Sequence, residues 1–120
     1  PLRTLMARGV IVGNGCDWNP CFINPLHGLY AAITRKPRKG VYGDQPFGTD
    51  ECISPMQALK TYTWNSAYCM FWEDNIGSLE PGKYADLVIW GKNPCTADPE
   101  EMLDIKVEAT MVDGKWVYNA

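Results

Sequence analysis

The sequence predicts an α/β unit followed by a smaller β-rich module. In residues 1–75, a short apolar run is followed by a glycine-rich turn and then by two segments in which apolar residues recur at helical spacing. In residues 76–120, short apolar runs of strand type lie between turn signals. We therefore expect two parts, 1–75 and 76–120, with the boundary near Asn75.

The first expected element is a buried strand over residues 9–13. Its apolar positions, Val10 to Val12, follow one another without polar alternation, as they do in parallel sheets. Glycines end the run and Asp17 follows, before an Asn-Pro turn signal. An α/β protein places a carboxylate at the mouth of a sheet or barrel in this way, although an aspartate at such a turn also commonly caps nearby backbone amides.

A helix is expected after this turn, because Asn24 is a good N-cap and Pro25 suits the first helical position. Apolar residues then follow at helical spacing: Leu26, Leu29, Tyr30 and Ile33. If this unit stood alone, the stripe formed by Leu26, Leu29 and Ile33 would be exposed and would promote association. Residues 35–52 are rich in glycine and proline and predict a long loop, a kind of segment that is often functional.

A second helix is expected to begin after Ser54, because Gln57 completes a capping box with it. We expect this helix to continue to about Trp72 and to bury one side. That side consists of Ala58, Leu59, Tyr62, Ser66, Cys69 and Met70.

The second part begins with a strand over residues 87–90. A short helix over residues 99–103 is opened by Asp98. Two further strands, 107–112 and 115–118, form a hairpin around the pair Asp113-Gly114, which is a strong turn signal.

Composition excludes several classes of protein. The chain has 120 residues, a net charge of −3 and no apolar run long enough to span a membrane, so we expect neither nucleic acid nor membrane as a partner. Its five cysteines are an odd number and lack a Cys-x-x-Cys pair, which predicts reduced, mostly buried thiols in a cytoplasmic protein. Because the chain begins at Pro1, we expect it to be a piece of a longer protein.

Three further features are not expected to carry chemistry. Residues 77–83 have the spacing of a phosphate-binding loop, but Tyr84 replaces the required Ser or Thr, and Glu80 and Pro81 oppose phosphate binding. His27 is the only histidine, so the chain cannot build a histidine cage for a metal. Cys16 lacks an activating base in its neighbourhood and is expected to pack within the turn.

The order of motifs resembles the C-terminal end of the metal-dependent amidohydrolase superfamily, most closely its amidohydrolase family 3 branch. The most specific run, residues 76–88, reads Ile-Gly-Ser-Leu-Glu-Pro-Gly-Lys-Tyr-Ala-Asp-Leu-Val. The other stretches that carry the resemblance are residues 9–20, 29–35, 54–63, 65–67 and 107–118. One departure is Cys16, at a position where the family more often has serine.

This resemblance implies the last strand-helix unit of a TIM-like (β/α)8 barrel, followed by part of a small composite β-sandwich. It also implies one or two divalent metal ions, with zinc expected, in the full-length parent. Asp17 matches the aspartate that touches the metal and takes a proton from the attacking water, so it is the expected catalytic residue and metal ligand. Trp18 and Asn19 are expected to lie near the substrate. The other ligands belong to segments absent from this chain.

The parent is therefore expected to hydrolyse a carbon–nitrogen bond, other than a peptide bond, in an amide-like small molecule. An alternative from another class is a non-catalytic folding or interaction module, since a strand such as residues 9–13 needs neighbours on both edges. In either case we expect a homo-oligomer or association with the missing part of the parent.

Overall fold

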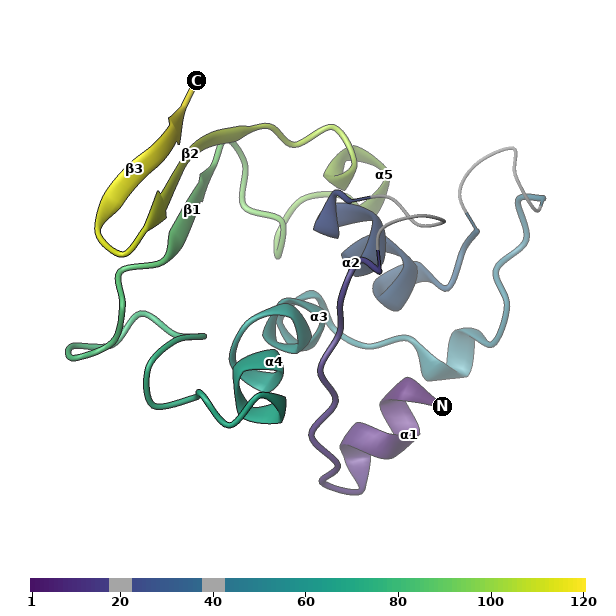
Figure 1. Ribbon diagram of the computed structural model, residues 1–120. Helices are drawn as coiled ribbons and strands as arrows, with labels where there is room; N and C mark the ends of the chain where they lie inside the picture. Colours follow the sequence, from purple (N-terminus) through teal and green to yellow (C-terminus); the bar gives the residue numbers. More distant parts are fainter. Residues whose placement is uncertain (18–22, 38–42) are drawn as a thin grey trace.

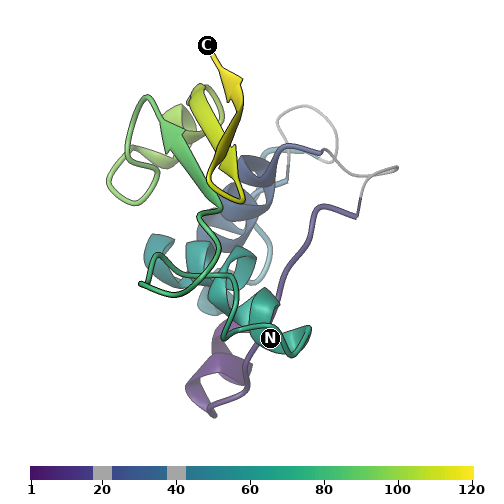
Figure 2. The same cartoon turned by 60° about the vertical axis from the view of Figure 1, so that its left-hand side comes forward.

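The computed structural model describes residues 1–17, 23–37 and 43–120, in which helices occupy the middle of the molecule and a small sheet lies at one end (Figure 1). The two termini lie at opposite ends, and the turned view in Figure 2 agrees. The elements in chain order are α1 (Leu2–Ala7), α2 (Pro25–Thr34), the 3-10 helix η1 (Thr49–Glu51), α3 (Pro55–Tyr62), α4 (Trp64–Cys69), β1 (Leu87–Trp90), α5 (Pro99–Met102), β2 (Val107–Val112) and β3 (Lys115–Asn119).

Helix α2 begins where the sequence predicts. The Asn24 side chain accepts a hydrogen bond of 3.0 Å from the Leu26 backbone N–H, and Pro25 is the first helical residue. The helix ends at Arg35, whose φ of 56° is left-handed. Leu26 and Leu29 are buried, so the expectation that this apolar stripe would be exposed is wrong.

The expected helix from Ser54 to Trp72 is two helices. Its start is confirmed: Ser54 and Gln57 form the capping box. Thr63 then leaves the helical region, with φ −119° and ψ −103°, and separates α3 from α4. α4 ends at Cys69, and Cys69 and Met70 are exposed rather than buried because the break turns this last stretch away from the core.

The three strands form one antiparallel sheet in the order β1-β2-β3. The predicted hairpin is confirmed: Asp113 and Gly114 both have positive φ, of 48° and 73°, as a two-residue type I′ turn requires. The Asp86 carboxylate accepts a 2.7 Å hydrogen bond from the Asp113 backbone N–H, which ties this turn to the residue preceding β1.

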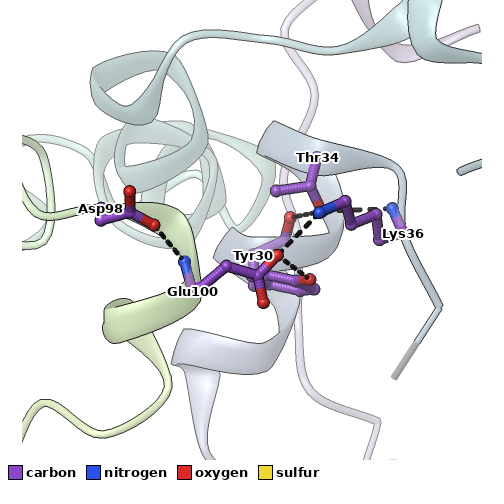
Figure 3. Close-up of polar contacts among 5 residues, drawn as sticks. All are labelled: Tyr30, Thr34, Lys36, Asp98 and Glu100. Carbon is purple, nitrogen blue, oxygen red and sulfur yellow. Dashed lines mark hydrogen bonds and ion pairs between the residues drawn. The ribbon is translucent and has the colours of Figure 1, made fainter. Parts of the chain in front are cut away.

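The core joins both predicted parts of the chain. Residues of α2 and α3 pack with Met102 of α5 and with Ile105, and Leu26 and Met102 are almost completely buried. Figure 3 shows the polar contacts at the edge of this core, where the Tyr30 hydroxyl donates to Glu100 at 3.1 Å and Lys36 pairs with the same carboxylate at 2.7 Å. Burial, followed by the contact with Glu100, raises the pKa of Tyr30.

The expected strand at residues 9–13 is not a strand. Gly9 lies in a turn with a φ of 80°, residues 10–13 pair with no other strand within the described residues, and Val10 is 47% exposed. The physical reason is that an apolar strand of parallel type needs a neighbour at each edge, and these residues offer none. In the described part of the chain, no helix is long and apolar enough to cross a membrane.

Candidate functional site

Figure 1 shows a segment without helix or strand that leads away from α1, and the described part of this segment ends at Asp17. Its side chain is exposed and its φ of 42° is left-handed, a conformation that aspartate tolerates better than most residues. No hydrogen bond or ion pair joins its carboxylate to another of the described residues. The side chain is therefore available to a group outside them.

The backbone that precedes Asp17 is held by α3 and α4. The Asn65 side-chain amide donates to the Val12 carbonyl at 2.9 Å, and the Asn14 backbone N–H donates to the Thr61 carbonyl at 2.9 Å. The Ser66 hydroxyl lies 3.0 Å from the Asn14 carbonyl oxygen. These contacts fix residues 12–14 against the helix pair.

Gly13 lets the segment approach α4 closely. A Cβ at this position would lie 3.2 Å from both the Cys69 sulfur and the Ser66 hydroxyl. Immediately after it, the Asn14 side chain accepts a 2.9 Å hydrogen bond from the Gly15 backbone N–H, which begins the turn toward Asp17. The glycines that the sequence places before Asp17 thus serve close packing and a turn.

The described residues do not form a complete metal site. Among them, no three His, Cys, Asp or Glu side chains are grouped so that they could hold an ion. His27 lies in the first turn of α2, is half-buried and belongs to no such group among the described residues. A carboxylate oxygen is a suitable metal ligand, and Asp17 carries one, but the described residues do not supply a whole ligand set.

The other expected site residues are not among those that the structure describes. Trp18 and Asn19 fall outside the described residues, as do residues 38–42 of the long loop. That loop contains η1, where the Glu51 carboxylate accepts a 2.9 Å hydrogen bond from the Thr4 backbone N–H and a second bond from the Thr4 hydroxyl. Part of the loop therefore secures α1.

The run 77–83 is a structural turn. The Lys83 ammonium donates to the Glu73 carbonyl at 2.5 Å and to the Ser78 hydroxyl at 2.7 Å, so its donors face the loop itself. The Ser78 hydroxyl, followed by Lys83, lowers the pKa of Glu80. A strand follows the turn where a phosphate-binding loop would open a helix.

The four cysteines among the described residues are free. Cys16, Cys52 and Cys95 are half-buried, and burial raises the pKa of the Cys95 thiol. Cys69 is exposed and none of the four is fully buried, so the expectation of mostly buried thiols is wrong for these cysteines.

Asn65 and Ser66 contact the segment that precedes Asp17, and these contacts were not predicted from the sequence. Asparagine and serine are mediocre helix formers, and each holds an inward position in a short helix. A residue of low helix propensity within a helix indicates that its side chain makes a contact. It does not indicate which group the side chain contacts.

The comparisons with known proteins agree with this architecture. The profile described as Amidohydrolase family matches residues 1–118. The chain belongs to the amidohydrolase family.

Individual relatives extend the match across nearly the whole chain. An N-substituted formamide deformylase of Arthrobacter pascens is 30% identical over 119 residues, which are 98% of this chain and 21% of that protein. The protein LONG AFTER FAR-RED 3 of Arabidopsis thaliana is 34% identical over 116 residues, which are 97% of this chain and 19% of that protein. The chain thus spans about a fifth of the length of these relatives.

A solved structure is similar in fold as well as in sequence. The crystal structure of an amidohydrolase from Thermotoga maritima MSB8 superposes with a TM-score of 0.72 at 26% identity. The similarity covers 99% of this chain and 26% of that chain.

Proposed function

We propose that this chain is the C-terminal portion of an enzyme that hydrolyses a carbon–nitrogen bond, other than a peptide bond, in an amide-like small molecule. Residues 1–75 then contribute the last unit of a (β/α)8 barrel, and residues 76–120 contribute part of a β-sandwich. We propose the cytoplasm as its location, because the cysteine pattern favours reduced thiols.

The observation that carries this proposal is the continuity of the family match through residues 1–118. The match includes the segment that ends at Asp17 as well as the sheet, so it is not confined to one structural motif. The formamide deformylase, at 30% identity over 98% of this chain, supports small amides as the substrate class.

Asp17 is the residue that we propose for proton transfer. Its exposed carboxylate accepts a proton from the water that attacks the substrate carbon, and then passes that proton to the leaving nitrogen. The nitrogen departs as a neutral amine, which is a much better leaving group than an amide anion. Trp18 and Asn19 are proposed to contact the substrate because they follow Asp17 directly.

A divalent ion, zinc by our proposal, belongs to the full-length protein. Asp17 supplies one oxygen ligand, and the family resemblance implies that the remaining ligands come from segments outside this chain; the described residues hold no group of three. When bound, such an ion lowers the pKa of a coordinated water toward neutrality.

The test is a release assay with the full-length protein on N-substituted formamides, cyclic amides and aminopurines. We expect amine from the formamides, ammonia from the aminopurines or a ring-opened amino acid from the cyclic amides, with at least one class turned over. Phosphate monoesters and carboxylic esters serve as controls for other hydrolytic chemistry. Turnover of the control substrates alone, with no carbon–nitrogen cleavage across the panel, would contradict the proposal.

A second candidate is a folding or interaction module without catalysis. The observation that favours it is the extended segment at residues 10–16, which pairs with no strand among the described residues and leaves Val10 half exposed. This candidate predicts no tightly bound zinc. About one or more zinc ions per full-length chain, measured by plasma mass spectrometry after dialysis, would count against it.

A further inference from the structure

We infer that Asn65 and Ser66 are positioning residues for Asp17: they fix the backbone of residues 12–14 and thereby hold the carboxylate in place for proton transfer. This inference rests on the proposed function, because it takes Asp17 as the proton acceptor. The two residues act through the segment and do not themselves touch the reacting atoms.

The clamp begins with the break between α3 and α4. A continuous helix would bond the Thr61 carbonyl to the backbone N–H four residues later, but Thr63 leaves the helical region and frees that carbonyl. The Asn14 backbone N–H donates to the Thr61 carbonyl instead, at 2.9 Å. Thr61 is fully buried, and its carbonyl accepts from both the Asn14 N–H and the Ser66 hydroxyl, so losing both partners would leave it unsatisfied away from water.

Asn65 provides the second contact. Its side chain is only 4% exposed, and its amide donates to the Val12 carbonyl at 2.9 Å. Burying an amide is unfavourable unless it is bonded, so the geometry ties Asn65 and the segment together. An aspartate would have the same shape, but it would set a carboxylate oxygen against that carbonyl.

Ser66 provides the third contact. Its hydroxyl lies 2.7 Å from the Thr61 carbonyl and 3.0 Å from the Asn14 carbonyl, and it lies 3.3 Å from the Asn14 N–H. One hydroxyl therefore bridges the freed helix carbonyl and the segment. Replacement by alanine removes this bridge with little change of volume.

The clamp lies close enough to constrain Asp17. Asp17 lies three positions after Asn14, so the carboxylate-bearing residue stays within roughly 10 Å of a fixed point. Close packing of Gly13 on α4 prevents the segment from moving inward. Proton transfer is sensitive to placement, and a displacement of about 1 Å costs up to ~10²-fold in rate.

The experiment compares Asn65→Asp and Ser66→Ala in the full-length protein. Hydrogen exchange of the peptide covering residues 10–17 reports the clamp without reference to catalysis, and the loss of one net hydrogen bond predicts exchange faster by about fivefold. Turnover of an amide substrate reports placement of Asp17. We expect kcat to fall by about 10- to 100-fold with KM nearly unchanged, because substrate binding is not the step affected.

Matched controls separate the clamp from general damage. Asn75→Asp makes the same change of charge at an exposed asparagine, and Thr96→Val removes an exposed hydroxyl that donates to the Asn93 carbonyl, in the second part of the chain. Both should leave exchange at residues 10–17 and kcat as in the parent. Ser66→Thr retains the hydroxyl and should restore most of the activity that Ser66→Ala loses.

Three outcomes decide the inference. Faster exchange together with a lower kcat at constant KM supports it. Unchanged exchange, or a kcat within about threefold of the parent while Asp17→Asn is inactive, overturns the clamp and leaves the proposed function standing. Full turnover by Asp17→Asn overturns the role of Asp17 itself, and the clamp with it. If Asn65→Asp does not fold, Ser66→Ala decides by the same readouts.

Discussion

At the scale of single residues, small side chains determine how closely segments approach one another. Gly13 brings the Asp17 segment against α4, and Gly28 brings α2 against α3. A Cβ on Gly28 would lie 1.7 Å from the Tyr62 hydroxyl oxygen and 2.7 Å from its ring carbon, closer than atoms can pack. These glycines are required by contact and not by a positive φ.

Gly28→Ala should therefore destabilise the protein by about 1–3 kcal/mol, because Tyr62 or helix α2 has to move out of the core. The measurement is the midpoint of urea unfolding. Gly15→Ala is the matched control, since a Cβ there meets nothing within 4 Å, and its effect should stay within about 0.5 kcal/mol. Equal midpoints for the two variants would show that the approach of α2 to α3 is looser than described.

At the scale of elements, start signals could be predicted from the sequence because they are local. The N-caps Asn24, Ser54 and Asp98 and the Asp113-Gly114 turn all bond within a few residues, and each is confirmed. The break at Thr63 is not local. It is stabilised by Asn14, whose backbone N–H donates to the Thr61 carbonyl and which lies 47 positions before Thr61 in the chain. No pattern within the helix could reveal that partner.

The strand expected at residues 9–13 does not form, because a strand depends on its neighbours as well as on its own pattern. Its pattern indicates which neighbours it needs, but a strand forms only where those neighbours are present. The position of Asp17 after this segment was predictable from the glycines and the turn signals, whereas the Asn65 and Ser66 contacts behind it depend on tertiary packing. Asp17 could therefore be named as the candidate residue from the sequence, whereas the contacts that hold its segment could not.

Helix α1 depends on an acid-sensitive contact. Hydrogen bonds from the Thr4 hydroxyl and backbone lower the pKa of Glu51 in the folded protein. Because the folded pKa is lower than the unfolded value of about 4.3, the contact contributes fully above that value and is lost as the pH falls through the folded pKa. The attachment of α1 should therefore weaken only below about pH 4.

The pH dependence can be followed through the NMR shift of the Thr4 amide proton. Its midpoint should lie below about 4.3, and Glu51→Gln should abolish the titration while it retains an oxygen acceptor. A midpoint at or above the ordinary glutamate value would mean that Thr4 does not stabilise the charged carboxylate.

At the scale of the whole molecule, α2, α3 and α5 share one core, whereas the sheet exposes much of its apolar surface. β1 and β3 are both edge strands, and Trp116, Val117 and Tyr118 of β3 are each at least half exposed. Within the described residues, no element covers this surface from the other side of the sheet. Surfaces of this kind mark contact with further protein.

The 120-residue chain should accordingly associate in solution as a dimer or a higher oligomer. Light scattering across a wide range of concentration is the measurement. Val117→Lys, which places a charge on the edge strand, should shift the distribution toward smaller species. A monomer of constant mass at every concentration would oppose the prediction for the chain by itself.

The same sheet shows which signature residues are structural. Asp86 holds the β2–β3 turn and Lys83 closes the loop before β1, so the most specific run of the family resemblance serves the fold of the second part. The family match extends from residue 1 to residue 118 and thus joins this structural run to the Asp17 segment. Under the proposed function, catalysis depends on residues 1–75, through Asp17.

The most direct measurement of that dependence is the turnover of an amide substrate by the full-length protein carrying Asp17→Asn. Asp113→Asn is its matched control, because Asp113 is also exposed and also has a left-handed φ. We predict that Asp17→Asn lowers kcat by about 10²-fold or more and that Asp113→Asn leaves it nearly unchanged. Turnover by Asp17→Asn within about tenfold of the parent, with the fold intact, would contradict the proton-transfer role.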